Sequence, residues 1–307
     1  MAWLTGWLYR KAITVSNGSA DYQTKVLVGE SSGATGEEVD CGGKCQTDFD
    51  DLRFTGSDGQ TLLDYWIESI TGTTPNQLAT IWVQNDATPS TTCYMYYGKA
   101  DATAVSDGDA TFPFYDHFPN SSVDTNKWTV AGTPVVASSR VLVEVAESIK
   151  GKVDISNSGF FAIRWSGHVS AEAAGTMSEG CGQAYDLNAC SLLSQASPAF
   201  YRLLNDAWSA ANTVATDASD YIYEITHPGT GTATIYRNGV SMATVATNDT
   251  NAKYIVIRAG VTGSSGHLDT DWIFARKFAA TEPTFAFGSE EYWIPPFRNY
   301  YPHILAH

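Results

Sequence analysis

The chain has 307 residues, enough for two domains that each bury a core without a metal or a disulfide scaffold. Aromatic residues make up 12% and charged residues only 17%, with 26 glycines, a balance typical of short strands joined by tight turns. The formal net charge is −15, and because binding to phosphate backbones needs clustered Lys and Arg, we expect no nucleic-acid partner.

Targeting and redox signals are sparse. No apolar run reaches the length of about 20 residues that a membrane span needs, so we expect none. The first residues have no basic segment before an apolar one and no small-residue cleavage site, so no signal peptide is expected. Five cysteines predict no disulfide framework, although Cys41 with Cys45 and Cys181 with Cys190 could each close a short loop. Zinc at Cys41 and Cys45 would need two more ligands, which the nearby sequence lacks.

The first third of the chain alternates apolar and polar residues in short runs, as β-strands do. Residues 7–16 and 22–29 alternate around an Asn-Gly turn and predict a first hairpin. Residues 52–55 and 63–67 alternate around an Asp-Gly turn and predict a second, central hairpin. Further strands at 79–83 and 93–97 make six in about a hundred residues, the pattern of a β-sandwich.

A small, polar, acidic stretch at residues 100–111 predicts a linker, and a second domain begins near Phe112. Asn238-Gly239 between alternating runs predicts a type I′ turn, because both residues tolerate positive φ. No period of 3.6 persists for a dozen residues, so little helix is expected. The predicted strands of this domain are 128–130, 140–145, 160–165, 200–204, 221–226, 232–236, 241–245, 254–259 and 270–274.

After Gly288 the composition changes to three prolines and five aromatic residues in nineteen. Such a segment can form neither a helix nor a central strand, so we expect an extended peptide whose rings need a surface to cover them. Two alternatives remain open: an assembly tail that docks on a partner, and a strap over the second domain of the same chain. The aromatic residues of this predicted assembly tail are Tyr292, Trp293, Phe297, Tyr300 and Tyr301.

Several motifs are specific enough to indicate a family. The chain reads W-L-Y-R-K-A-I-T at 7–14, D-F-D-D-L-R-F-T-G-S-D-G-Q-T-L-L-D-Y-W-I-E at 48–68, W-V at 82–83 and Y-Y-G at 96–98. These motifs resemble a widespread uncharacterised domain of bacterial, archaeal and viral surface proteins. Residues 112 to about 291 resemble a concanavalin A-like (laminin G-like) jelly roll, through F-P-N-S-S-V-D-T-N-K-W at its entrance and D-W-I-F-A-R-K-F-A-A-T-E-P-T-F-A-F-G-S-E-E at its exit.

The resemblance implies an all-β protein of two tandem β-sandwiches, the second a concanavalin A-like jelly roll, a fold often used for glycan binding. The predicted domains are an N-terminal β-sandwich at 1–111, a jelly roll at 112–289 and the Pro/aromatic tail at 290–307. Cellular members of such families are usually secreted. This chain lacks the export signal and opens as virion and tail proteins do, which assemble in the host cytoplasm.

Catalytic patterns are missing from the sequence. Glycoside hydrolysis needs two carboxylates that flank the bond, and jelly-roll glycosidases typically carry them in a run such as E-x-D-x-x-E, which is not found. Neither a G-x-S-x-G elbow nor a G-x-x-x-x-G-K loop occurs. We therefore expect a protein that is not an enzyme. The nearest acidic pairs are Asp48 with Asp50, Asp107 with Asp109, Asp269 with Asp271, and Glu290 with Glu291.

Binding sites are predicted by residue type. Sugars are held by aromatic rings on pyranose faces and by polar groups on hydroxyls, which makes Trp165, Tyr185, Asp186, Asn188, Tyr201, Arg202 and Trp208 the glycan-binding candidates. No cofactor is expected apart from calcium, which takes oxygen ligands from acidic turns. The calcium candidates are Asp48, Asp50, Asp51, Asp58, Asp107 and Asp109, and none of them forms an EF-hand loop.

The predicted function is that of a non-enzymatic virion structural protein, in a tail fibre, a spike or a capsid decoration, with a jelly roll that binds a host-surface glycan or receptor. Its predicted partners are other copies of itself and other virion or surface proteins. The alternative is a cell-surface or filament-forming adhesin located extracellularly. A glycan hydrolase is the second alternative.

Overall fold

A computed structural model describes residues 2–86, 92–156, 160–169, 177–182, 190–195, 197–204, 207–213, 219–229, 231–247, 252–259 and 267–294. Over these ranges the chain forms β-strands and one four-residue helix, α1 (Gly108–Thr111), which confirms the predicted all-β class. No helix there has the length and apolar character needed to cross a membrane. The chain divides into unit 1, Met1–Ala20, Thr24–Ser106 and Thr284–His307, and unit 2, Asp21–Gln23 and Asp107–Pro283.

Unit 1 contains a sheet of five strands in the order β24-β1-β8-β4-β5 and a sheet of four in the order β3-β2-β7-β6. Apolar side chains from both sheets, among them Ile13, Val26, Phe54 and Ile81, form one buried cluster. The strands are β1 (Tyr9–Ser16), β2 (Gln23–Gly29), β3 (Val39–Asp40), β4 (Arg53–Thr55), β5 (Leu62–Leu63), β6 (Tyr65–Thr71), β7 (Leu78–Gln84), β8 (Thr92–Tyr97) and β24 (Thr284–Tyr292).

The two predicted hairpins of this unit need correction. β1 and β2 lie in different sheets, so the first predicted hairpin is wrong. In the second, Phe54 does pair with Leu63, but the chain then changes sheets and β6 pairs with β7. Alternation along a strand shows that one face is buried, whereas it does not show which strand lies beside it. In a sandwich, consecutive strands often belong to opposite sheets.

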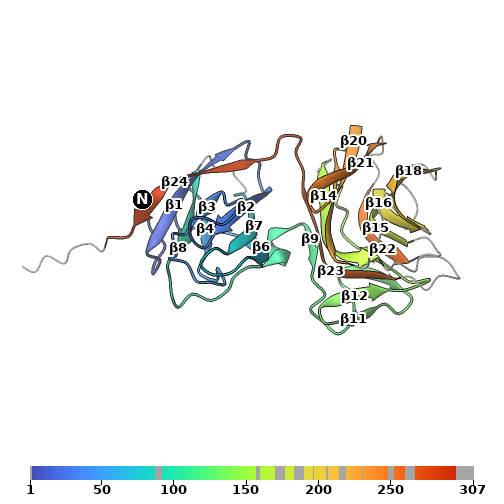
Figure 1. Cartoon of the computed structure of the whole chain (residues 1–307), viewed down its shortest axis with the longest axis horizontal. Coiled ribbons are helices and arrows are strands. Elements are labelled where there is room, and N and C mark those ends of the chain that lie inside the picture. Colours follow the sequence, from blue (N-terminus) through green and yellow to red (C-terminus); the bar gives the residue numbers. More distant parts are fainter. Residues whose placement is uncertain are drawn as a thin grey trace, which may run out of the picture. The chain divides into compact units, whose positions relative to one another are not determined.

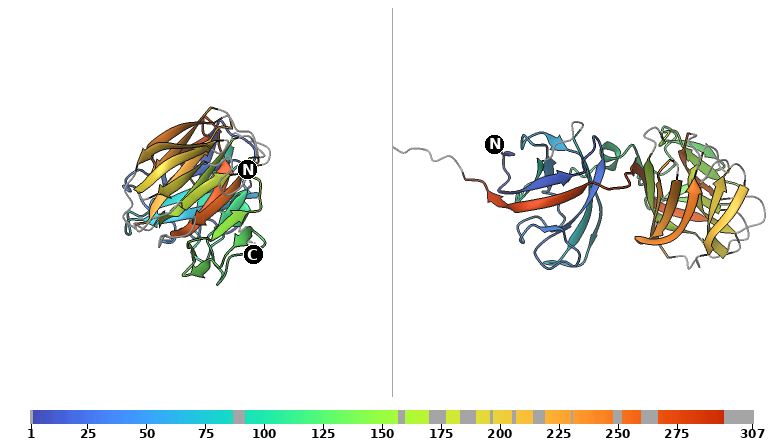
Figure 2. Two further views of the ribbon diagram at one scale, coloured as in Figure 1. Left: turned by 90° about the vertical axis from the view of Figure 1, so that its right-hand side faces the viewer. Right: turned by 90° about the horizontal axis from the view of Figure 1, so that it is seen from above.

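The last strand, β24, completes the sheet of the first unit. Figures 1 and 2 show β24, in red, alongside the blue β1. In this antiparallel pair Tyr292 lies opposite Tyr9, and Thr284 lies opposite Ser16. The domain boundary therefore differs from the predicted one at 289, and the first three residues of the predicted tail, 290–292, are strand. Phe285 and Phe287 pack against the unit 1 core, which is why this segment pairs there rather than acting as a strap over the second domain.

Two carboxylates fix the end of β24. Glu291 accepts hydrogen bonds from Arg10 at 2.7 and 2.8 Å, and the guanidinium lies 4.3 Å from the ring centres of Trp3 and Tyr94. Glu290 accepts a 2.6 Å hydrogen bond from the Tyr97 hydroxyl and pairs with Lys44. Burial works against ionisation of Glu290, but Lys44 and Tyr97 outweigh it and lower the pKa of this carboxyl.

Unit 2 is a larger sandwich. Its first sheet has seven strands: β10 (Trp128–Ala131), β13 (Ser148–Gly151), β22 (Tyr254–Ala259), β15 (Met177–Gly182), β16 (Cys190–Gln195), β17 (Ser197–Leu204) and β18 (Ala207–Thr213). Its second sheet has eight: β11 (Val135–Ala137), β12 (Arg140–Val143), β23 (Leu268–Lys277), β14 (Phe161–Val169), β19 (Tyr221–His227), β20 (Gly231–Arg237) and β21 (Val240–Thr247), with β9 (Phe114–Asp116) paired to β23.

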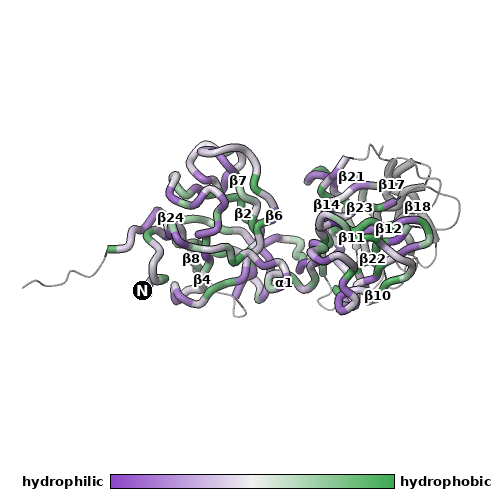
Figure 3. The backbone as a smooth tube through the Cα atoms, turned by 90° about the horizontal axis from the view of Figure 1, so that it is seen from below, coloured by the Kyte–Doolittle hydropathy of each residue, from purple (hydrophilic) through white to green (hydrophobic). Residues whose placement is uncertain are grey.

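The core of unit 2 follows from strand alternation. Phe161, Ile163 and Trp165 point from β14 into one buried cluster that both sheets share. Figure 3 colours the backbone by hydropathy, and hydrophobic (green) and hydrophilic (purple) segments alternate along the described chain. The predicted type I′ turn between β20 and β21 is confirmed, with φ of 49° at Asn238 and 76° at Gly239.

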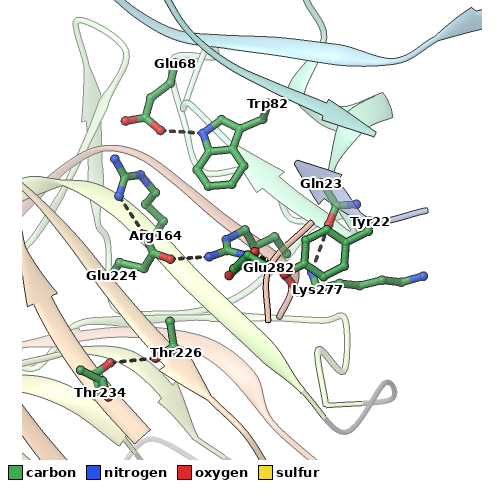
Figure 4. Close-up of polar contacts among 11 residues, drawn as sticks. Tyr22, Gln23, Glu68, Trp82, Arg164, Glu224, Thr226, Thr234, Lys277 and Glu282 are labelled. Carbon is green, nitrogen blue, oxygen red and sulfur yellow. Dashed lines mark hydrogen bonds and ion pairs between the residues drawn. The ribbon is translucent and has the colours of Figure 1, made fainter. Parts of the chain in front are cut away.

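A buried ion network lies on the opposite face of the second sheet. Glu224 accepts hydrogen bonds from Arg164 at 2.8 Å and Arg276 at 2.6 Å, and Figure 4 shows Arg164 directed at Glu224. Arg276 also donates to Glu282 at 3.0 Å and to the Tyr22 hydroxyl at 3.3 Å. Burial would raise the pKa of Glu224, but the two guanidinium groups lower it further than burial raises it. The carboxylate therefore stays ionised although it is enclosed.

One carboxylic acid lies inside the core of unit 2. Glu179 on β15 is fully buried and accepts a 2.6 Å hydrogen bond from the Thr270 hydroxyl. Burial raises its pKa to about 8, despite opposing contributions from Thr270 and the nearby Trp165 indole. Among the described residues, neither the indole Nε1 of Trp165 nor the second oxygen of Glu179 has a hydrogen-bond partner. At neutral pH the group is a neutral acid in the core.

Removal of β24 tests how unit 1 is built. We expect a chain that ends at Pro283 to lose roughly 3 kcal/mol or more of unit 1 stability, because the packing of Phe285 and Phe287 and a full strand ladder are lost. Hydrogen exchange followed by mass spectrometry would show the loss as fast exchange in β1. A chain that ends at Ile294 keeps β24 and is the matched control. Equal β1 protection in both truncations would contradict this role.

The buried acid gives unit 2 a pH dependence of defined sign. Between about 4.5 and about 8 the folded chain holds a proton on Glu179 that the unfolded chain releases, so stability falls as pH rises through this window. We expect Glu179→Gln to remove a slope of up to about 1.4 kcal/mol per pH unit. Urea unfolding at pH 5 and pH 9 measures it. Glu144→Gln, at an exposed carboxyl of the same unit, should leave the slope unchanged, and parallel profiles for all three proteins would refute the assignment.

Candidate functional site

In the described part of unit 2, five polar side chains form a connected group, the Arg140 cluster: Arg140, His168, Asp220, Asp269 and Asp271. These residues come from β12, from the end of β14, from the residue before β19 and from the start of β23. Their neighbours along the strands, such as Val141 and Leu268, are buried between the sheets. Because side chains alternate along a strand, the cluster lies on the outer face of the eight-stranded sheet.

Arg140 is the centre of the cluster. Its Nη2 and Nη1 atoms donate to the two oxygens of Asp220 at 2.7 and 3.1 Å, a bidentate pair, and its Nε donates to Asp269 at 2.5 Å. Asp271 is 3.8 Å from Nη1. On the other side of Asp220, the Nδ1 atom of His168 lies 2.8 Å from Oδ1. One guanidinium thus joins three carboxylates.

The charges of the cluster are unevenly compensated. Burial would lower the pKa of Arg140, but its hydrogen bonds to Asp220 and Asp269 raise it. Burial would raise the pKa of Asp220, yet His168 and Arg140 lower it. For Asp271 burial dominates, the neighbouring carboxylates add to it, and the pKa is raised although Arg140 opposes the change. Asp271 is therefore the least compensated acid, and its side chain is 42% exposed.

Chemically, this arrangement provides hydrogen-bond acceptors and donors at a fixed spacing. Carboxylates held by a bidentate guanidinium keep free lone pairs on their exposed sides. A ligand rich in hydroxyl groups, which both donate and accept, fits such a surface. His267, whose ring centre lies 6.1 Å from that of His168, extends the polar surface by one more imidazole.

The predicted glycan-binding residues have different outcomes. Trp165 is wrong as a surface ring, because it is fully buried in the core and stacks on Tyr223 at 5.3 Å. Tyr185, Asp186 and Asn188 lie outside the residues that the structure describes. Tyr201, Arg202 and Trp208 lie on β17 and β18 of the seven-stranded sheet, where side chains are also outside the described part, so their role stays a prediction.

The aspartates predicted to bind calcium accept hydrogen bonds that hold turns in the described fold. Asp51 is fully buried and accepts hydrogen bonds from the backbone N–H groups of Gln46, Gly98 and Lys99. Asp48 accepts the backbone N–H of Asp50 at 3.1 Å. These contacts are those of turn-forming aspartates.

Asp58, Asp107 and Asp109 also make hydrogen bonds or ion pairs within the local structure. Asp58 accepts from the backbone of Gln60 and Thr61. Asp107 caps α1 through Ala110, and Asp109 pairs with Lys127 at 2.5 Å. Within the ranges that the structure describes, no group of three or more His, Cys, Asp and Glu side chains could hold a metal ion.

Unit 1 carries a pocket of about 330 Å³ beside the paired terminal strands. Tyr9 stacks on Tyr97 at 5.7 Å and packs against Tyr292 at 5.6 Å, and the Lys44 ammonium lies 4.6 Å from the Tyr9 ring. The pocket lining therefore combines one aromatic ring, that of Tyr9, with the polar residues Lys44 and Gln46. Its lining residues are Leu8, Tyr9, Lys44, Cys45, Gln46, Asp51, Gly98 and Ala100.

An exposed apolar strip continues from this pocket. Tyr292, Trp293 and Ile294 are 57%, 36% and 68% exposed. The backbone N–H of Trp293 donates to the backbone carbonyl of Leu8, whose side chain is also exposed, at 41%. The strip is defined by these four residues. Of the predicted tail, Tyr292 and Trp293 thus lie at the surface of unit 1, whereas Phe297, Tyr300 and Tyr301 lie outside the described residues.

The sequence offered only one signal for the Arg140 cluster. Asp269 and Asp271 stand out as an alternating acidic pair, since side chains two apart share one face of a strand. Arg140, His168 and Asp220 come from distant segments of the sequence. They meet because β12 and β14 both pair with β23, and β19 pairs with β14.

Comparison with known sequences gives one partial match. Residues 48–131 match the family described as a domain of unknown function, DUF2341, a stretch that runs from unit 1 into unit 2. No curated protein matches the chain.

Solved structures give distant likenesses. The carbohydrate recognition domain of Emp47p is 13% identical, over 56% of this chain and 100% of that one, with a TM-score of 0.42. An uncharacterised protein from Mycobacterium paratuberculosis is 12% identical, over 53% and 99%, with a TM-score of 0.43. The binding domain of botulinum neurotoxin DC, in complex with rat synaptotagmin II, is 11% identical over 50% and 44%, with a TM-score of 0.38. Likenesses this distant do not bear on what the chain binds.

Proposed function

We propose that the protein is a non-enzymatic structural protein of a virion, assembled in the host cytoplasm as a tail fibre, spike or capsid decoration, whose unit 2 binds glycans. The Arg140 cluster is the observation that supports glycan binding. Its carboxylates are held in place by a shared guanidinium, so they are spaced before a ligand arrives and lose little freedom when it binds. An adhesin on a cell surface is the alternative with the same binding chemistry.

The cluster suits a neutral polyol better than an anion. Three carboxylates surround one guanidinium, and the bidentate pair with Asp220 occupies the two donors on one edge of Arg140. An anionic ligand would meet the surplus of negative charge, whereas sugar hydroxyls can donate to Asp271 and accept from an imidazole N–H. We therefore assign uncharged or cationic sugars as the ligand class.

Assembly is supported by the apolar strip. Large apolar side chains on a monomer surface seldom lie side by side without a partner to cover them. The strip lies at the end of β24, where the chain continues into further aromatic residues. A symmetric homo-oligomer would bury the strip of each copy in the same contact.

A glycan hydrolase is the second candidate, and Glu179 is the observation that favours it. A carboxyl whose pKa is raised beside a tryptophan has the environment of a general acid. However, a general acid must come within hydrogen-bond reach of the bond that it protonates. Glu179 is fully buried between the sheets, so a substrate would have to open the core of unit 2.

Glycan binding can be tested at Asp271. We expect the full chain to bind members of a polysaccharide and oligosaccharide panel, and Asp271→Asn to weaken the best ligand roughly tenfold, because a charge-assisted hydrogen bond is lost. Isothermal titration measures the affinity, and analysis of the incubated sugars reports any cleavage.

Asp101→Asn is the matched control, since it removes the same charge from an 86% exposed side chain in unit 1. It should bind as the unchanged protein does. Equal affinity of all three proteins would place the ligand elsewhere, and release of shorter sugars that Glu179→Gln abolishes would favour the hydrolase.

Assembly can be tested at the strip. We expect the full chain to form a concentration-dependent oligomer, and Trp293→Ser with Ile294→Ser to shift it toward the monomer, because two exposed apolar side chains leave the contact. Light scattering after size-exclusion chromatography gives the mass. Val240→Ser alters an apolar residue of unit 2 that is 64% exposed, close to the 68% of Ile294, and should change nothing. A monomer at every concentration would contradict assembly through this surface.

A further inference from the structure

Unit 1 contains a pair of thiols on the loop between β3 and β4. Cys41 follows β3 directly and is fully buried in the unit 1 core. Cys45 is partly buried, packs against the same cluster and lines the 330 Å³ pocket. Both are free thiols. One sulfur of the pair is thus enclosed in the core, while the other belongs to a residue of the pocket wall.

The backbone between them brings the two side chains together. Gly42 and Gly43 have φ of 59° and 70°, a left-handed pair that glycine adopts without strain, and the Lys44 N–H donates to the Cys41 carbonyl at 3.1 Å. The chain therefore reverses between the cysteines. Both side chains pack against the same apolar cluster of unit 1, so the turn sets the two thiols on the same side of the loop.

The loop is held in this shape by its neighbours. The Cys41 N–H donates to the Gly29 carbonyl and the Gly43 N–H to the Glu30 carbonyl, each at 2.9 Å. The Cys45 thiol lies 3.8 Å from the Glu30 carbonyl oxygen. Because the turn is already closed by hydrogen bonds, formation of a covalent link across it orders little further chain.

We propose that Cys41 and Cys45 are an oxidisable dithiol that closes to an intramolecular disulfide when the protein meets a small disulfide oxidant. The Cys45 thiolate attacks one sulfur of the oxidant R–S–S–R, whose S–S bond breaks and releases one thiol R–SH after protonation. The Cys41 thiolate then attacks the Cys45 sulfur of the mixed disulfide and expels the second R–SH. Two protein thiols become one disulfide, and the oxidant is reduced to two thiols.

The order of the two steps follows from the burial of the two sulfurs. An oxidant can approach Cys45 through the pocket, while Cys41 has no exposed surface. Burial raises the pKa of Cys41 well above its ordinary value; Cys45 and Asp51 raise it further and Lys11 opposes them. Closure should therefore be slower than attack on Cys45, and faster at higher pH.

This inference does not depend on glycan binding or on assembly. In a reducing cytoplasm the pair stays a dithiol, and outside a cell it closes. The disulfide would tie the loop after β3 to the core of unit 1, next to Lys44 and its partner Glu290 on β24. A particle protein would thus gain a covalent brace only after it leaves the compartment in which it is made.

Glutathione titration of the full chain tests the proposal. The protein is equilibrated with increasing ratios of oxidised to reduced glutathione, quenched in acid, alkylated under denaturing conditions and mapped by mass spectrometry. We expect the peptide that contains both cysteines to lose two hydrogens and to escape alkylation, while Cys93, buried on β8, remains alkylated. A 41–45 peptide that stays fully alkylated in pure oxidised glutathione would overturn the proposal.

Three variants separate the steps. Cys45→Ser should abolish closure, and Cys93→Ser, the matched control at a buried thiol, should leave it intact. Cys41→Ser should stop after the first step and accumulate one glutathione adduct on Cys45. Should Cys41→Ser fail to fold, the Cys45→Ser result still decides, since closure that persists without Cys45 contradicts the pairing. An adduct on Cys41 in the Cys45→Ser protein would contradict the order.

Discussion

The pairing of β1 with β24 is the constraint on which the architecture depends. β1 has β8 on one side and β24 on the other, and these partners come from residues 92–97 and 284–292. Without β24, β1 would be a sheet edge with an unpaired row of backbone groups. Glu290 and Glu291 then add charge pairs with Lys44 and Arg10 at the end of the ladder. Most of unit 2, Asp107–Pro283, is therefore an insertion between two parts of unit 1.

The acidic composition is explained in part by what the carboxylates do inside the molecule. Asp51 organises a turn through three backbone amides, Glu224 is ionised between two arginines, and Glu290 anchors the last strand. These acids are structural, because each has donors that repay the cost of burial. Asp271 differs from them, since its nearest cation is 3.8 Å away and its side chain remains partly exposed. This contrast is the reason that the Arg140 cluster is proposed as the binding surface.

Local patterns predicted the elements of this fold better than their arrangement. The Asn238-Gly239 turn and most of the strands of both units follow from alternation and turn chemistry. The sheet partners do not, because strands β1 and β2 follow one another in sequence and yet enter opposite sheets. The segment at 284–292 was hidden by the aromatic and proline-rich residues around it. Trp165 could have been assigned to the core, since Phe161 and Ile163 lie on the same face of the strand.

The insertion of unit 2 has a consequence for the order in which the chain folds on the ribosome. β1 emerges early, while β24 is synthesised only after the whole of unit 2. Unit 2 can collapse as soon as β23 has emerged, but the nascent unit 1 must wait with an open edge. During that delay the same edge can accept the last strand of a neighbouring nascent copy. The distance between ribosomes on one messenger RNA and the binding of chaperones to the open edge would then affect whether two chains exchange strands.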